Sequence, residues 1–425
     1  MLDTSIEIAL TVFVMLMIVA QLVAIKLRIP YTLTLVVIGI VLTALSAVAL
    51  SGFPFSGTLN ISVQWIRSLY NQLVGSGLFV GLVVPPLIFE AMIHIRREEL
   101  RAVVRPSFLL ATAGVILSTV VAGIVVWELE GLSLFSAMVF AVIIAPTDTI
   151  TVLEIFKRVK VPGRLSTMMD MEAAFNDATA IVLFSIIISS AGFGRASIFA
   201  GIEVFLYSFV GGGLVGMVVA WIAKVAHENV NDKMAELMLT IAAVYGSYVL
   251  ATSLGASGLI AVTIVGLYFG NSTMKRALTK RVKWSILAFW EVAAFIGNAI
   301  AFMLIGFDTN LSILARAAGL IVVAYASTII ARAAAVYPTF ALFGYVGKKM
   351  RLGWGNIATI AGVRGALSIA LLATLASSGA VSQSDLATIT TMVMGVVFVS
   401  IIVQVPALSS YATRLFGRHR ASYEA

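Results

Sequence analysis

Long apolar stretches separated by short polar connections run along the whole chain. A bilayer core about 30 Å thick takes roughly 20 apolar residues per helix. Stretches that meet this requirement centre near residues 15, 40, 82, 117, 145, 178, 210, 243, 263, 296, 324, 366 and 398. The pattern therefore predicts an all-α polytopic membrane protein with about 13 transmembrane helices.

The composition agrees with this prediction and narrows the class of protein. Hydrophobic residues make up 60% of the 425 residues and charged residues only 11%, with a mean hydropathy of +1.06. A soluble domain carries about 25% charged residues. The absence of cysteine excludes disulfides, zinc thiolates and iron–sulfur clusters. The three histidines are scattered and no nucleophile–base pair is visible, so we expect neither an enzyme nor a resident cofactor.

Basic residues gather in every second connection. The crowded connections hold most of the 28 Lys and Arg residues, and the alternate ones hold only Arg67, Arg195 and Arg316. Lys and Arg stay on the cytoplasmic side of short loops. The alternation therefore predicts a multi-pass protein of the cell membrane with its N-terminus outside and its C-terminus cytoplasmic. The net charge of +8 then reflects this topology and attraction to anionic lipid, and no nucleic-acid partner is expected.

The connections between the spans are short. The longest, residues 51–70, is too short for a domain, and the chain ends soon after its last apolar stretch. We therefore expect residues 1–425 to form a single membrane unit with no soluble regulatory domain.

The pair Asn176-Asp177 lies inside an apolar stretch that is long enough to cross a membrane. A charge at the bilayer centre costs from about 2.5 kcal/mol on insertion scales to over 10 kcal/mol in simulations. A span keeps such a carboxylate where it faces other polar groups or a water-filled cavity. At 1.5 Å per residue, Asp177 lies roughly 16 Å along its helix, which is near the midplane.

A second carboxylate, Glu172, lies on the same predicted helix. Five residues at 100° each place Glu172 and Asp177 about 140° apart around the helix axis. One should therefore face an ion path and the other a structural partner. Two arginines, Arg332 and Arg364, fall inside apolar stretches, and a buried guanidinium needs a carboxylate. We predict a Glu172–Arg364 ion pair, with Asp148 as the rival partner of the arginine.

Two spans are interrupted in opposite halves of the chain. The fifth reads AVIIAPTDTITVL, in which Pro146 removes a backbone donor just before Thr147 and Asp148. The twelfth reads IAGVRGALSIA, with Gly362 and Gly365 around the arginine. Such a pair predicts an inverted-repeat transporter with two interrupted crossing helices and a site at the midplane. The alternative is that Pro and Gly are simply common in membrane helices.

Other polar positions allow two interpretations each. Glu90, four residues after Pro86 in VVPPLIFEAM, is either an interfacial acid or a second carboxylate on the ion route. Glu291 fits an acid near a helix end that snorkels or pairs with a basic side chain. The run of glycines at 211–213 indicates close helix packing rather than phosphate binding.

Four segments together resemble one family. MDMEAAFNDATAIVLF resembles the E-S-x-x-N-D signature of the cation:proton antiporters of family 1, the NhaP-type proteins and Na+/H+ exchangers. APTDTITV is similar to their A-T-D-P-V-A-V segment, VVPPLIFEA to L-P-P-I-I-F-[DE]-A, and VRGALSIAL to R-G-A-[LV]-[SA]. The four occur in family order and cover the chain nearly end to end.

The resemblance implies an NhaA/NhaP-like antiporter fold. It implies a homodimer in which each protomer has a core domain, with spans about 73–190 and 312–412, and a dimerisation domain from the remaining spans. It also implies electroneutral exchange of Na+, with Li+ as a further substrate, for H+ by alternating access, in pH and sodium homeostasis.

The resemblance also assigns roles to residues. Asp177 would carry the cation and the proton, with Asn176 as its orienting neighbour and Asp148 holding the helix crossing. Na+ would lie at Asp177, Thr147 and Glu90. Ala173 stands where many members have Ser, so its backbone or a water would replace a hydroxyl ligand. Glu172 and Arg364 would form the stabilising pair.

Two other classes of transport protein compete with this hypothesis. A K+/H+ antiporter would use the same residues with another cation. A passive cation channel is less favoured; it would carry current without proton countertransport.

Overall fold

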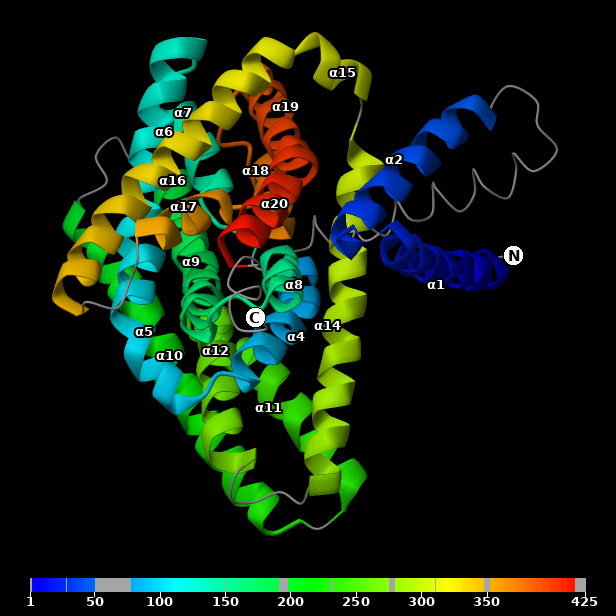
Figure 1. The fold of residues 1–425 in the computed structure, drawn as a ribbon, viewed down its shortest axis with the longest axis vertical. Helices are drawn as coiled ribbons and strands as arrows, with labels where there is room; N and C mark the ends of the chain where they lie inside the picture. The colour runs from blue at the N-terminus through cyan, green and yellow to red at the C-terminus, as the bar shows by residue number, and fades with distance from the viewer. Residues whose placement is uncertain are drawn as a thin grey trace, which may run out of the picture.

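The computed structural model describes residues 2–27, 29–49, 78–148, 150–190, 198–230, 232–274, 280–309, 311–347 and 352–416. Within these residues the regular structure is helical (Figure 1). The helices are α1 (Leu2–Leu27), α2 (Tyr31–Ala49), α4 (Leu78–Ile93), α5 (Arg97–Leu109), α6 (Val115–Glu130), α7 (Leu134–Ile144), α8 (Ile150–Val159), α9 (Gly163–Ser190), α10 (Ile198–Glu228), α11 (Lys233–Ser253), α12 (Gly258–Tyr268), α14 (Lys280–Asp308), α15 (Leu311–Arg316), α16 (Ala318–Gly347), α17 (Leu352–Ile360), α18 (Ala366–Ser378), α19 (Gln383–Val399) and α20 (Val405–Phe416).

Seven helices in the described part of the chain are long and apolar enough to cross a membrane. Six shorter apolar helices accompany them. The prediction of an all-α membrane protein is confirmed. The number of helices that cross the bilayer stays a prediction, because length and composition alone do not determine it.

In the described part of the chain, three π-helical turns extend helices instead of ending them. η1 (Leu110–Gly114) joins α5 to α6, η2 (Phe269–Thr273) follows α12, and η3 (Ser400–Gln404) joins α19 to α20. A π-turn shifts the register of the side chains that follow it and is frequent at functional sites. Only η3 supplies side chains to the site described below.

α9 and α4 lie among the other helices in the middle of the view (Figure 1). α14 packs against α2, and α10, α11 and α12 pack on one another. α16 crosses α6 and also contacts α17 and α19. α9 contacts α5, α7, α12 and α4, so it is surrounded by other helices.

Glycine allows the closest of these contacts. A Cβ on Gly212 of α10 would overlap the backbone carbonyl of Ser257 at the start of α12 and lie 3.2 Å from Ile260 Cβ. The helices approach at this point because no side chain separates them. The interpretation of the glycine run as a packing surface is confirmed for Gly212.

Candidate functional site

Two helices are broken at the same place in the fold. α7 ends at Ile144 and α8 begins at Ile150, while α17 ends at Ile360 and α18 begins at Ala366. Between them the Asp148 backbone N–H donates a 2.7 Å hydrogen bond to the Val363 carbonyl oxygen. The prediction of two interrupted helices that cross is confirmed; the inverted-repeat relation between them stays a prediction.

Gly365 lets the two broken segments touch. A Cβ at this position would lie 2.5 Å from the Cβ of Asp148, closer than real Cβ contacts come. The glycine therefore fixes how closely α18 approaches the Thr147-Asp148 segment.

Arg364 lies at the crossing but pairs with no carboxylate among the described residues. Its Nη1 donates to the carbonyl oxygens of Ala145 at 2.7 Å and Pro146 at 3.2 Å. The last carbonyls of a helix have no partner within the helix, and a positive charge at this end is favourable. Arg364 therefore caps α7, and the predicted Glu172–Arg364 pair is wrong.

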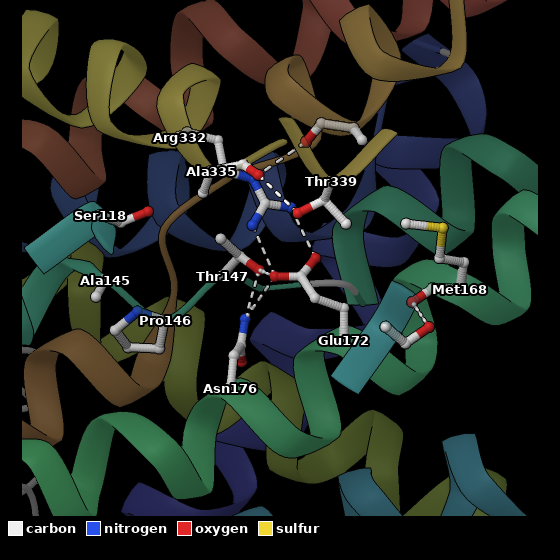
Figure 2. A network of polar contacts seen from close by, with 12 residues as sticks. Ser118, Ala145, Pro146, Thr147, Met168, Glu172, Asn176, Arg332, Ala335 and Thr339 are labelled. Atoms are coloured by element: carbon white, nitrogen blue, oxygen red, sulfur yellow. Dashed lines mark hydrogen bonds and ion pairs between the residues drawn. The ribbon is translucent and has the colours of Figure 1, made fainter. Parts of the chain in front are cut away.

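The partner of Glu172 is Arg332 of α16. Arg332 Nη1 and Nη2 donate to Glu172 Oε1 and Oε2, each at 2.7 Å (Figure 2). Arg332 Nε donates to the Ala358 carbonyl at 3.2 Å. Both side chains are buried, with 1% of Glu172 and 5% of Arg332 exposed. A two-point pair of this kind offsets the cost of burying both charges through short charge-assisted bonds.

Asn176 and Thr147 extend this pair toward the crossing (Figure 2). The Asn176 side-chain amide donates to Glu172 Oε1 at 3.1 Å and to the Thr147 hydroxyl at 2.9 Å. The Thr147 hydroxyl lies 3.5 Å from the same Glu172 oxygen. Asn176 thus joins α9 to the broken segment after α7. Its side chain bonds to Glu172 and Thr147 rather than to Asp177.

A cavity of about 360 Å³ lies beside the crossing. Helix α9 faces it with Asp170, Ala173, Ala174 and Asp177, which follow the i, i+3, i+4, i+7 spacing of one helical face. Asp177 is partly exposed there. Among the residues that the structure describes, none forms a hydrogen bond or ion pair with Asp177. Glu172 does not line this cavity and pairs with Arg332 instead, so the predicted divergence of the two carboxylates is confirmed.

Four other residues that the sequence assigned to the ion site share the cavity with Asp177. They are Glu90, Thr147, Asp148 and Ala173. Glu90 comes from α4 and lies 3.6 Å from the His94 ring nitrogen. The Asp148 carboxylate lies 2.9 Å from the Thr151 hydroxyl. Asn176, Glu172 and Arg364 do not line the cavity.

Several polar residues of the site do not follow from the sequence interpretation. Glu291 of α14 lines the cavity instead of pairing near a helix end. Asp170 also lines it; its seven-residue spacing from Asp177 was the available signal, because it places both on one helical face. Asn298 and Ser368 also line it; Ser368 matches the last position of the R-G-A-[LV]-[SA] segment, but the sequence interpretation gave neither residue a role.

η3 holds the second broken segment from the other side. Ser400 Oγ accepts a 3.2 Å hydrogen bond from the Arg364 backbone N–H. Gln404 Nε2 donates to the Ile360 carbonyl at 2.7 Å, which satisfies an end carbonyl of α17. These residues replace backbone partners that the break removes.

Within the described residues, no group of three or more His, Cys, Asp or Glu side chains could hold a metal ion. The cavity instead offers a carboxylate with neighbouring hydroxyl and carboxyl oxygens. Such a set can bind one weakly held hard cation or a proton at Asp177.

Comparison with known proteins agrees with this architecture. The chain is 31% identical over 361 residues to the Na(+)/H(+) antiporter NhaS2 of Synechocystis sp.; the match covers 84% of this chain and 62% of that relative. It is 30% identical over 379 residues to the Na(+)/H(+) antiporter NhaH of Halobacillus dabanensis, covering 88% and 89% of the two chains.

A solved structure shares the fold. The sodium proton antiporter MjNhaP1 from Methanocaldococcus jannaschii superposes with a TM-score of 0.74 at 21% identity, covering 97% of this chain and all of that one. This likeness confirms the predicted NhaP-like fold. Residues 10–413 match the family described as "Sodium/hydrogen exchanger, transmembrane", and the chain belongs to this family.

Proposed function

We propose that this protein is a secondary active sodium:proton antiporter that exchanges Na+, and also Li+, for H+ by alternating access. The observation that carries the proposal is the state of Asp177. It is a carboxylate inside the helical bundle that opens to a cavity and has no basic partner among the described residues. The names of the relatives support Na+ as the cation, and they lend no support to the K+/H+ alternative.

Asp177 couples the two fluxes by competition. Its carboxylate is neutralised by one Na+ or by one H+, and a bare carboxylate is costly to carry through the low-dielectric interior. Either loaded form has the same net charge, so the exchange of one for one is electroneutral. Na+ binding at Asp177 draws on oxygens of Thr147 and Glu90, with the Ala173 backbone or a water in support.

The Glu172–Arg332 pair serves as scaffold in this mechanism. The charges of Glu172 and Arg332 neutralise each other, so the pair adds no net charge to the cation site. Asn176 and Thr147 connect it to the crossing, and Asp148 holds the crossing through its backbone N–H. The scaffold thereby keeps Asp177 directed into the cavity while the ion changes.

The domain arrangement and topology belong to the same proposal. The spans within residues 73–190 and 312–412 move as a core domain against a dimerisation domain formed by the remaining spans of a homodimer. Contacts of α4 with α12 and α14 as well as α9 support α4 as the boundary between the two proposed domains. The basic connections orient the N-terminus outside and the C-terminus in the cytoplasm of the cell membrane, where exchange serves pH and sodium homeostasis.

A flux assay tests the function. The purified protein in proteoliposomes with an internal pH dye should release or take up protons when Na+ or Li+ is added outside, without a voltage-dependent current. Proton movement with K+ alone would support the K+/H+ alternative. Current without proton movement would support a channel and contradict the proposal.

A further inference from the structure

Two buried polar side chains on other walls of the cavity have no protein partner. Asn298 of α14 is 6% exposed and Ser368 of α18 is 1% exposed, and both line the cavity that contains Asp177. Within the described chain, Asn298 Oδ1 and Ser368 Oγ make no hydrogen bond. Leaving a buried polar group without a hydrogen bond is costly, so these two oxygens indicate a ligand.

The broken helix explains why the Ser368 hydroxyl is left over. Buried Ser and Thr side chains in helices commonly donate to the carbonyl four residues earlier, as Thr374 of the same helix does to Ala370 at 2.9 Å. For Ser368 that earlier residue is Arg364, which precedes the start of α18. The carbonyl is therefore not in a helical turn, and the hydroxyl is left without this partner.

Helical spacing brings Asn298 to the cavity. Glu291, Ala294, Phe295 and Asn298 all line it, and they repeat on α14 the i, i+3, i+4, i+7 pattern of the α9 face that contains Asp177. α14 and α18 are in contact. Asn298 and Ser368 thus place neutral side-chain oxygens on two neighbouring helices in the wall of the cavity that Asp177 lines.

We propose that Asn298 Oδ1 and Ser368 Oγ are ligands of the cation that binds at Asp177. The inference rests on the proposed function and adds two residues to the cation site. Neutral oxygens can replace part of the hydration shell of an alkali cation without changing the charge of the site. They stabilise the cation-loaded state and leave the protonated state unaffected, so they set the affinity for Na+ separately from the affinity for H+.

The test compares Ser368→Ala and Asn298→Ala with wild type in proteoliposomes, with the Na+ KM measured at several pH values. We expect each substitution to raise the Na+ KM about three- to tenfold, the effect of one lost polar contact. The proton concentration that doubles the Na+ KM should stay unchanged, because proton affinity is unaffected. Thr374→Val, which removes a hydroxyl bound within the same helix, should leave both quantities unchanged.

Conservative variants separate the loss of a side-chain oxygen from misfolding of the protein. Ser368→Thr and Asn298→Ser keep an oxygen at each position and should retain a Na+ KM closer to wild type than the alanine variants. An unchanged Na+ KM in folded alanine variants, or an equal shift in Na+ and proton affinity, would overturn the inference while wild-type exchange continued. Absence of Na+-driven proton movement in wild type would instead contradict the proposed function itself.

Discussion

Glu172 and Asp177 are two carboxylates on one helix, five residues apart, with opposite surroundings. Glu172 is 1% exposed and receives two 2.7 Å hydrogen bonds from Arg332 and one of 3.1 Å from Asn176. Asp177 faces a cavity of about 360 Å³, and no described side chain bonds to it. One charge is neutralised within the protein, and the other is left for a mobile cation or proton.

The difference shows how one helix can combine stability with transport. A fixed arginine makes a carboxylate part of the scaffold, because removing either partner leaves an uncompensated buried charge. A carboxylate without such a partner accepts whichever cation reaches it. The separation of about 140° around the helix keeps these two chemistries from mixing.

The largest expected effect follows from removing the unpaired carboxylate. Asp177→Asn should abolish Na+-driven proton movement, because an amide binds neither a proton nor a cation as a carboxylate does. The variant should melt in detergent at or above the wild-type temperature, since an amide costs less to bury. Retained exchange in folded Asp177→Asn would show that another group carries the ions.

The paired carboxylate should instead affect stability. Arg332→Ala should lower the free energy of unfolding by about 3–5 kcal/mol, because it leaves Glu172 buried and charged. Measurement by denaturant titration in detergent micelles should show partial recovery in the double variant Arg332→Leu with Glu172→Leu, which removes both charges. An Arg332→Ala variant as stable as wild type would contradict the scaffold role.

The helix crossing lies between the surroundings of Glu172 and those of Asp177. We expect any side chain at Gly365 to disrupt this crossing. Gly365→Ala would place its Cβ 2.5 Å from that of Asp148 and should cost about 1–3 kcal/mol through overpacking, with reduced exchange. Gly213→Ala is the matched control, because nothing lies within 4 Å of its added Cβ. Equal melting temperatures and exchange rates for the two variants would argue against a close crossing.

The smallest expected effect concerns the neighbour of Asp177 on the cavity face. Ala173 is one helical turn before Asp177 and lines the same cavity. Ala173→Ser adds a hydroxyl oxygen near the cation and should lower the Na+ KM about two- to fivefold. A higher Na+ KM, measured in the same flux assay, would mean that the added hydroxyl obstructs the cation instead of binding it.

The sequence allows much of the cavity to be predicted and less of its support. Asp177, Thr147, Asp148 and Glu90 are visible because a polar residue in an apolar span is costly and therefore informative. The sequence does not show which arginine, Arg332 or Arg364, pairs with Glu172, because both lie inside spans and either could reach a carboxylate.

Packing and backbone demands decide between the arginines. α16 lies against α6 and α17, which brings Arg332 to Glu172, while the unsatisfied carbonyls at the end of α7 attract Arg364. Carbonyls that a helix break leaves without partners do not appear in a pattern of side chains. The roles of Ser400 and Gln404 escape the sequence for the same reason.

The pH dependence of the Na+ KM tests the central claim most directly. If Na+ and H+ compete for one carboxylate, this competition determines how the Na+ KM changes with pH. On the acidic side of the activity range, the Na+ KM in proteoliposomes should rise about tenfold for each unit by which pH falls, by mass action. The maximal rate at saturating Na+ should change little over the same range. A Na+ KM independent of pH, with a maximal rate that falls instead, would show that the proton and the cation bind at different groups.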